Sequence, residues 1–140
     1  MTETSKVVHT ARTRTTGGRE HGISRSSDGR LDVGLAMPGS VRIGTNPEHL
    51  LAAAWSACFE TAIELAAQRR KITLPAGVMI DAEVDLNVVD SGHFLSVRFN
   101  VSLPGVKRAA AHGLIDEAHR TCPYSKATRG NMEVAIRLIE

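Results

Sequence analysis

The sequence contains little of what marks several specialised protein classes. Aromatic residues make up only 4% of its 140 residues, which is too few for a surface that stacks nucleic-acid bases. The 17 Lys and Arg residues nearly balance the 15 Asp and Glu residues, and a net charge of +2 is not the strong basic bias of most nucleic-acid-binding proteins. No apolar run approaches the roughly 20 residues of a membrane span. We therefore expect neither a nucleic acid nor a membrane as a partner.

Cysteine is also scarce, and the N-terminal segment has no apolar stretch. Two cysteines are too few for the disulfide framework of a small secreted domain. Residues 1–14 lack the apolar core of a secretory signal. Together these two features predict a cytoplasmic protein.

The sequence does contain enough apolar material for one folded domain. Hydrophobic residues make up 42% of the chain and charged residues 23%, a balance typical of a globular protein. The length suits one ordinary domain, so we expect residues 1–140 to form a single domain. Because large side chains are few, the composition favours burial of some apolar surface against a second chain.

The first third of the sequence has the pattern of short strands joined by turns. β-Branched residues dominate the first strand, and apolar residues alternate with other residues in the last, which is typical of a half-buried strand. Glycine-containing turns separate the three segments. The predicted strands lie at residues 7–14, 19–26 and 31–35. This arrangement predicts an antiparallel meander.

A long helix is predicted next, from Asn46 to about Arg70. Asn46 can cap the helix, Pro47 suits its first turn, and Glu48 lies at the positive end of the helix dipole. Apolar residues cover most of the circumference, so we expect the first four turns to be buried nearly all round. Seven of the sixteen residues from 52 to 67 are alanine, which lets other backbones approach closely.

The second half predicts a hairpin, a second helix and a closing strand. Alternating apolar residues at 78–89 and 93–103 flank a turn, which is the clearest hairpin pattern in the chain. Apolar residues at helical spacing predict a helix over 107–120, and residues 134–138 form the last strand. The order βββ-α-ββ-α-β predicts an α+β fold with antiparallel sheets and a long buried central helix.

The two cysteines are the first candidates for chemistry. Cys58 lies in the middle of the long helix, and Cys122 follows the second helix beside Pro123. Buried thiols can act simply as small hydrophobic side chains, and a structural disulfide is disfavoured in a reducing compartment. A redox-active pair is the third interpretation, because both cysteines lie on segments that look buried and could meet in the core.

A redox role requires that one thiol be activated. The thiolate is the nucleophile, and apolar surroundings raise the pKa of a thiol. Cys58 is too far from its helix N-terminus for the dipole to help, and an arginine would keep its charge when buried. Arg19, after a flexible glycine turn, is a candidate cation that Glu48 could hold in place. Their simpler alternatives are a solvated surface charge for Arg19 and an interaction with the helix dipole for Glu48.

A metal site is a further possibility at the second cysteine. His119 and Cys122 have the spacing of two ligands on one helix face, and Cys58 could join them. Structural zinc prefers four ligands, however, and the chain has no CxxC pair. We therefore expect no metal and no bound cofactor.

Three segments resemble a known protein family. Residues 44–50 read GTNPEHL, residues 57–59 read ACF, and residues 119–131 read HRTCPYSKATRGN. With the turns at residues 16–19 and 27–29, these segments resemble the organic hydroperoxide resistance proteins, which share a superfamily with the osmotically inducible peroxidases. The similarity covers essentially the whole chain, and the CPYS-x-ATRGN segment favours the first of these branches.

The resemblance implies a fold, an activity and a set of site residues. Members of the family are α+β homodimers with intertwined chains that reduce organic and lipid hydroperoxides with cysteines, without a metal or haem. Cys58 matches the peroxidatic cysteine and Cys122 the resolving cysteine. Arg19 matches the activating arginine, and Glu48 matches the carboxylate that orients it. The implied partners are an organic hydroperoxide and a reductant that is a lipoylated protein or another dithiol.

Two other functions stay open from the sequence. The same fold could serve as a non-enzymatic thiol redox sensor or as a small-molecule binding module. A sensor would need a transducing element such as a DNA-binding helix pair, and the sequence shows none. Repeated turnover of a hydroperoxide in the presence of a dithiol would distinguish an enzyme from either alternative.

Overall fold

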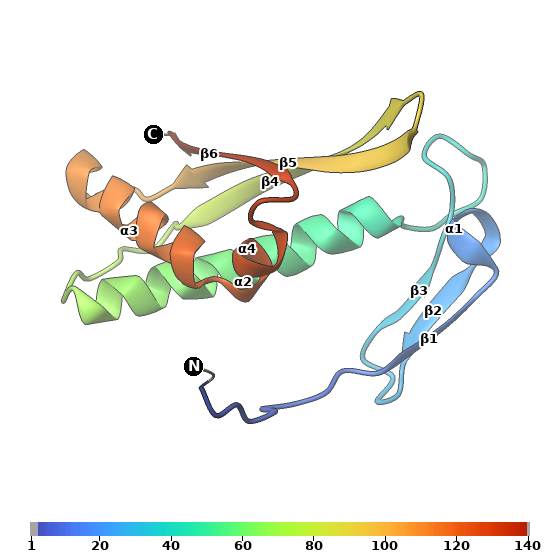
Figure 1. Ribbon diagram of the computed structural model, residues 1–140, viewed down its shortest axis with the longest axis horizontal. Helices are drawn as coiled ribbons and strands as arrows, with labels where there is room; N and C mark the ends of the chain where they lie inside the picture. The colour runs from blue at the N-terminus through green and yellow to red at the C-terminus, as the bar shows by residue number, and fades with distance from the viewer. Residues whose placement is uncertain (1–2, 140) are drawn as a thin grey trace. The chain divides into compact units, whose positions relative to one another are not determined.

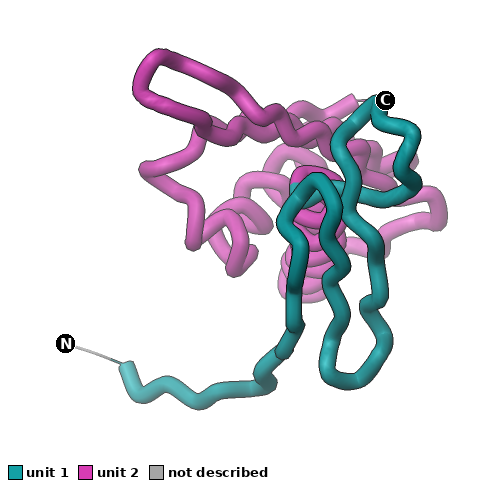
Figure 2. The backbone as a smooth tube through the Cα atoms, turned by 90° about the vertical axis from the view of Figure 1, so that its right-hand side faces the viewer, with its two compact units in different colours: residues 1–47 teal, residues 48–140 magenta. Residues whose placement is uncertain are grey.

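The chain forms two compact units, residues 1–47 and residues 48–140 (Figure 2). The computed structural model describes residues 3–139. The mixed α+β class predicted from the sequence is confirmed, with two three-stranded sheets and four helices among the described residues.

The first unit is a small antiparallel sheet with one turn of helix. Its elements are β1 (Thr13–Thr16), α1 (Gly18–His21), β2 (Ile23–Ser26) and β3 (Asp32–Gly34). β2 lies in the middle and pairs with both neighbours. The antiparallel meander was predicted, but the first strand begins at Thr13 and not at residue 7. Its pairing ends at Thr13 opposite Ser26, where β2 also ends, and an extended segment without a neighbour forms no strand.

The second unit contains a sheet with helices packed on one face (Figure 1). Its elements are α2 (Pro47–Arg69), β4 (Met79–Val89), β5 (Gly92–Ser102), α3 (Arg108–Thr121), α4 (Pro123–Thr128) and β6 (Glu133–Ile139). The predicted hairpin is confirmed as β4 and β5, which pair over their full length. The long helix and the second helix also lie within a residue or so of their predicted bounds.

The order of elements and one strand orientation differ from the prediction. The short helices α1 and α4 are additional, and β6 pairs with β5 in parallel and not antiparallel. The parallel pairing follows from the connection, because α3 and α4 carry the chain back along the sheet before β6 begins. A crossover of that length is what parallel neighbours require.

The core of the second unit lies between the sheet and the helices. Phe99 on β5 meets Trp55 and Phe59 of α2 edge-on, with ring centroids 5.2 and 5.3 Å apart. All three rings are completely buried. Three of the five aromatic residues therefore gather where the sheet meets α2, and smaller side chains of β5 and α3 complete the cluster.

The burial of α2 is one-sided, which corrects the prediction of a helix buried nearly all round. Its buried residues are Trp55, Phe59, Ala62, Ile63, Ala66 and Ala67, which share one helical face. Ala53, Ala54 and Ala57 are exposed.

The same helix contradicts the prediction that no apolar segment of the chain approaches the length of a membrane span. By length and composition α2 could cross a membrane, with a mean hydropathy of 1.4 over its most apolar window. The mean hydropathy of this window is high although it contains acidic residues, because its alanines and leucines contribute more than the acidic residues subtract. The core helix of a water-soluble protein meets the same criterion, and the large rings of α2 pack against the sheet.

Candidate active site

Cys58 lies on the edge of the buried face of α2. It precedes Phe59 in the helix and is half-buried, and its side chain packs against the hydrophobic core of the second unit. A mid-helix position makes the backbone around this thiol rigid, because every neighbouring peptide group is held in the helix ladder.

Cys122 stands at the junction of two helices. Its backbone N–H donates to the Ala118 carbonyl at 2.8 Å, which closes α3. Its ψ of 126° then turns the chain away, and Pro123 begins α4. Proline is favoured at the first position of a helix, so the sequence Cys-Pro ends one helix and starts the next. The side chain of Cys122 is completely buried.

The structure brings these two cysteines together. Both are free thiols, and Cys122 lies near enough to Cys58 to raise the pKa of its thiol. Residues distant in the sequence therefore meet in the way that a reversible disulfide requires, while their catalytic roles stay a prediction.

The surroundings of Cys58 within the second unit disfavour its thiolate. Burial raises the pKa of the Cys58 thiol, and the hydrogen bond and charge of Cys122 raise that pKa further. A hydrogen bond from the backbone N–H of Tyr124 acts in the opposite direction and lowers the pKa. The larger effects in this unit thus keep Cys58 protonated, so a cation would be needed to make it a nucleophile.

A second buried contact ties α2 to α4 beside the thiols. The indole N–H of Trp55 donates to the hydroxyl oxygen of Ser125 at 3.3 Å, and both side chains are completely buried. Trp55 lies about one helical turn before Cys58, and Ser125 lies in the first turn of the helix that follows Cys122. This bond therefore holds in register the two helices that carry the thiol pair.

His119 lies on α3, three residues before Cys122. Its ring centroid is 6.4 Å from that of Phe59, the neighbour of Cys58. Its Nδ1 atom is buried and has no hydrogen-bond partner within residues 3–139. Burial lowers the pKa of His119, and the Arg129 guanidinium lowers it further, while Asp116 acts to raise it. From the sequence, this histidine was a candidate only as a metal ligand.

The two charged residues of the predicted site lie in different units. Arg19 is in α1 of the first unit, whereas Glu48 is the second residue of α2, at the opposite end of that helix from its basic C-terminus. Glu48 is about 15 Å from Cys58 along the helix axis, at roughly 1.5 Å per residue. The action of Arg19 and Glu48 on the thiols is part of the proposed mechanism.

Glycines shape the short helix that carries Arg19. Gly17 and Gly18 have φ angles of 85° and 71°, in the left-handed region that favours glycine. A side chain at Gly22 would collide with the Gly18 carbonyl oxygen. The turn was predicted to lead directly into a strand, but these conformations produce one turn of helix before β2.

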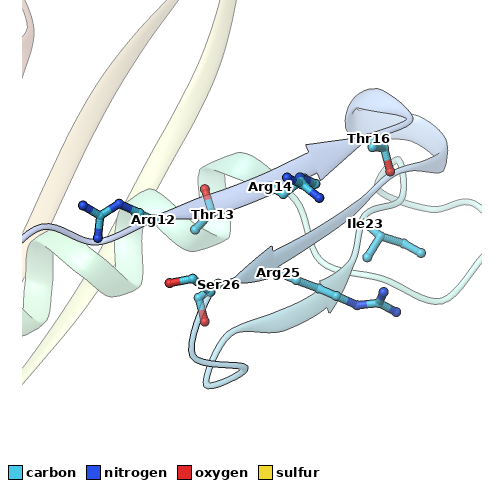
Figure 3. Close-up of a pocket in the computed structure, with 8 residues that line it drawn as sticks. Arg12, Thr13, Arg14, Thr16, Ile23, Arg25 and Ser26 are labelled. Carbon is cyan, nitrogen blue, oxygen red and sulfur yellow. The ribbon is translucent and has the colours of Figure 1, made fainter.

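Two pockets lie away from the cysteines. One, of about 640 Å³, lies on the first unit and is lined by three arginines, Arg12, Arg14 and Arg25, with serine and threonine hydroxyls (Figure 3). The other, of about 380 Å³, lies at the ends of β4, β5 and β6 beside Arg108. Neither lining includes Cys58 or Cys122.

No group of three or more His, Cys, Asp or Glu side chains that could hold a metal ion occurs in the part of the chain that the structure describes. His119 and Cys122, the pair with ligand spacing, thus gain no further ligand there. The chemistry available to the site is that of two thiols and one neutral imidazole.

Comparison with known proteins gives consistent matches over the full length. Residues 38–137 match the model of the OsmC-like protein family. The chain is 42% identical over 142 aligned positions to the organic hydroperoxide resistance protein of Xanthomonas axonopodis pv. citri, covering 99% of each chain. It is 37% identical to the organic hydroperoxide resistance protein OhrA of Bacillus subtilis, covering 97% of this chain and 99% of that one.

Solved structures show the same similarity. The crystal structure of the organic hydroperoxide resistance protein OhrB of Bacillus subtilis matches with a TM-score of 0.89 at 38% identity, covering 95% of this chain and all of that one. A putative organic hydroperoxide resistance protein of Vibrio cholerae, with captopril bound in one of its active sites, matches with a TM-score of 0.88 at 28% identity. The latter match covers 97% of this chain and 95% of the other.

Proposed function

Since the chain belongs to the organic hydroperoxide resistance proteins of the OsmC-like family, we propose that it is a thiol peroxidase that reduces organic hydroperoxides to alcohols. The observation that carries the proposal is the pair of neighbouring free thiols, half-buried Cys58 and buried Cys122, at the core of the second unit. Two thiols in contact can store the two electrons that reduction of one O–O bond consumes.

The first step of the proposed reaction is attack by Cys58. Its thiolate sulfur forms a bond to the distal oxygen of the hydroperoxide, the O–O bond breaks, and the alkoxide takes up a proton and leaves as the alcohol. Cys58 becomes a sulfenic acid. The apolar core beside the thiol favours alkyl or lipid hydroperoxides over hydrogen peroxide as substrates.

Arg19 and Glu48 have the role of making that thiolate available. Because burial and Cys122 raise the pKa of Cys58, ionisation needs a fixed positive charge nearby. In the proposal, the Arg19 guanidinium supplies the charge and also stabilises the charge that develops on the leaving oxygen. Glu48 holds the guanidinium in position by charge-assisted hydrogen bonds.

The remaining steps restore the enzyme. Cys122 attacks the Cys58 sulfenic sulfur, the S–O bond breaks, and a disulfide and water form. An external dithiol, such as the lipoyl group of a lipoylated protein, then reduces the disulfide by thiol–disulfide exchange. The cycle uses no metal and no bound cofactor. A disulfide that must be reduced at each turnover suits the reducing cytoplasm, and the substrates suit a role in the oxidative stress response.

The exposed face of α2 supports a homodimer with intertwined chains. Ala53, Ala54 and Ala57 leave a smooth apolar surface on which a second helix can approach closely. Large apolar residues elsewhere in the chain are also exposed, among them Val41, Ile43 and Val88. A second chain that covers these surfaces would explain why the core of one chain holds so little of its apolar material.

A turnover assay tests the proposed function. Wild-type protein with cumene hydroperoxide and dihydrolipoamide should consume many equivalents of the hydroperoxide. Cys58→Ser should abolish the reaction, because a hydroxyl is a weak nucleophile at neutral pH. Cys122→Ser should oxidise once and then become over-oxidised. Consumption of only about one equivalent by the wild type would instead indicate a sensor or a binding module, and full activity of Cys58→Ser would refute the mechanism.

A further inference from the structure

The resolving step of the proposed cycle requires a proton transfer that the two thiols alone do not provide. Cys122 must lose its proton when its sulfur attacks the Cys58 sulfenic acid, and the departing hydroxide must gain one to leave as water. Cys122 is completely buried, so this proton has no direct route to solvent from its sulfur. A base close to Cys122 would therefore speed disulfide formation.

His119 is positioned to act as that base. Cys122 has a φ of −61°, which is helical, and its backbone N–H still closes the α3 ladder. Only its ψ departs from the helix, and ψ does not affect the direction of the Cβ atom. The side chain of Cys122 therefore projects as the next position of α3, on the same face as His119 three residues earlier. Such pairs have Cβ atoms about 5–6 Å apart.

His119 also packs against α2, the helix that carries the attacked cysteine. Its ring lies against Phe59, which is adjacent to Cys58 in α2. Both Phe59 and Cys122 belong to the core cluster on which Cys58 packs. The imidazole thus lies between α3, which leads to Cys122, and the part of α2 that carries Cys58.

The protonation state of His119 suits a base. Its Nδ1 is buried and has no hydrogen-bond partner within the described residues, although most buried polar atoms in proteins have one. The charged groups around it are Arg129, which donates a hydrogen bond to the His119 carbonyl oxygen, and Asp116 on the same helix. Burial and Arg129 lower the pKa of the ring, against the weaker effect of Asp116, so the ring stays neutral at neutral pH.

We propose that His119 transfers the proton of the resolving step. Its unpartnered Nδ1 takes the proton of the Cys122 thiol as the S–S bond forms, and returns it to the hydroxide that leaves Cys58. The sulfur of Cys122 is oxidised and that of Cys58 is reduced, and the products are the disulfide and one water. This inference rests on the proposed peroxidase function and adds one residue to it.

Separate measurement of the two steps tests this role. Reduced protein is mixed with one equivalent of tert-butyl hydroperoxide and quenched with acid at increasing times. Trapping with dimedone measures the Cys58 sulfenic acid, and thiol counting measures the disulfide. In His119→Gln, oxidation of Cys58 should proceed at nearly the wild-type rate. Disulfide formation should be about 100-fold slower at neutral pH, within the usual range for loss of a general base.

The pH profile distinguishes proton transfer from packing. Without His119 the reaction depends on the Cys122 thiolate alone, so the rate in His119→Gln should rise about tenfold per pH unit below the thiol pKa. The wild-type rate should vary much less over the same range. His119→Asn keeps an acceptor oxygen near the place of Nδ1 but takes up no proton, and it should be as slow as His119→Gln. His112→Gln, at an exposed position of α3, is the matched control and should match the wild type.

Each other outcome would overturn the inference. Equal rates of disulfide formation and equal pH profiles in His119→Gln and the wild type would exclude proton transfer by His119. Equal slowing of both steps would show a packing role. Wild-type resolution in His119→Asn would show that only hydrogen-bond acceptance matters. In these three cases the peroxidase proposal stands, whereas a wild type that forms no disulfide would overturn both.

Discussion

At the scale of single residues, Cys58 has to meet two requirements that oppose each other, contact with Cys122 and ionisation of its own thiol. Its partner Cys122 must be close enough to form a disulfide, and that closeness raises the pKa of the thiol that has to ionise. Burial, which would favour an apolar substrate, raises the same pKa. A peroxidatic cysteine in this place therefore depends on charge supplied from outside its own helix and on a separate route for the proton of Cys122.

The bond between Trp55 and Ser125 gives a prediction at the same scale. Ser125→Ala would leave the indole N–H buried without a partner, at a cost of about 1–3 kcal/mol in the free energy of unfolding. It should also slow disulfide formation, because α4 would lose its register against α2. Urea denaturation and the acid-quench assay measure the two effects. Ser56→Ala is the control, since that hydroxyl bonds only to carbonyls of its own helix. Unchanged stability in Ser125→Ala would contradict this account of the bond.

At this scale, some features of the site could be predicted from the sequence and others could not. Cys58 and Cys122 could be selected because the chain has only two cysteines, and the family resemblance supplied their predicted roles. The unpartnered Nδ1 of His119 has no such signal, because it depends on what the folded chain places around one atom. The bond from Trp55 to Ser125 was likewise not predicted, since it joins residues far apart in the sequence.

At the scale of elements, α2 and α3 are linked by two arginines at the C-terminal end of α2 and one carboxylate of α3. The carboxylate of Glu117 on α3 accepts hydrogen bonds from Arg69 at 2.6 Å and from Arg70 at 2.9 Å. The hydrogen bond from Arg69, then that from Arg70, lowers the pKa of Glu117. The two helices that carry Cys58 and Cys122 are thereby linked at the end distant from Glu48.

The pKa of Glu117 predicts a pH-dependent stability. A carboxyl whose pKa is lowered by folding stabilises the fold above its unfolded pKa, and this stabilisation is lost as the pH falls through the folded value. Glu117→Gln should therefore lower the Tm slightly at neutral pH, and the difference should shrink below about pH 4. Glu64→Gln, exposed on α2, is the matched control and should leave the Tm nearly unchanged. A difference that persists in acid would exclude the ion pairs as its cause.

Elements were predictable where local signals were strong. The bounds of α2 follow from its capping residues, and the β4–β5 hairpin follows from strict alternation on both sides of a tight turn. The parallel orientation of β6 was not predictable, because it depends on the path of α3 and α4 and not on the strand's own residues. The one-sided burial of α2 was missed because its exposed side also carries apolar residues, Ala53, Ala54, Ala57 and Leu65.

At the scale of the whole molecule, the residues of the proposed mechanism come from both units of the sequence. Residues 48–139 supply the thiol pair, its packing and His119, and residues 3–47 supply Arg19. The proposed second chain adds the cover that the exposed side of α2 lacks.

Arg19 and Glu48 should act as one functional pair. Arg19→Ala should raise the pKa of Cys58 and slow its oxidation on the order of 100-fold, the scale on which loss of one electrostatic group slows catalysis. Glu48→Ala should slow it by roughly tenfold, as loss of an orienting partner does. Because Glu48 acts through Arg19, the double variant should be no slower than Arg19→Ala.

The oxidation rate of Cys58 against pH measures this coupling in all four proteins. Arg14→Ala, which removes another arginine of the first unit, is the control and should leave the profile unchanged. Additive effects of the two changes would refute the pairing. A normal rate with a lower Tm in Glu48→Ala would assign Glu48 only to its helix terminus, where such charges contribute about 0.3–1 kcal/mol.

The central claim is that Cys58 and Cys122 of one chain form a reversible redox pair driven by an organic hydroperoxide. The most direct measurement is a peptide map by mass spectrometry after one equivalent of tert-butyl hydroperoxide, before and after addition of a dithiol. The account predicts that both thiols are lost together, that a cross-linked peptide joins Cys58 to Cys122 of the same chain, and that the dithiol restores both. Consumption of the hydroperoxide with Cys122 left free, or a cross-link between Cys58 of two chains, would contradict it.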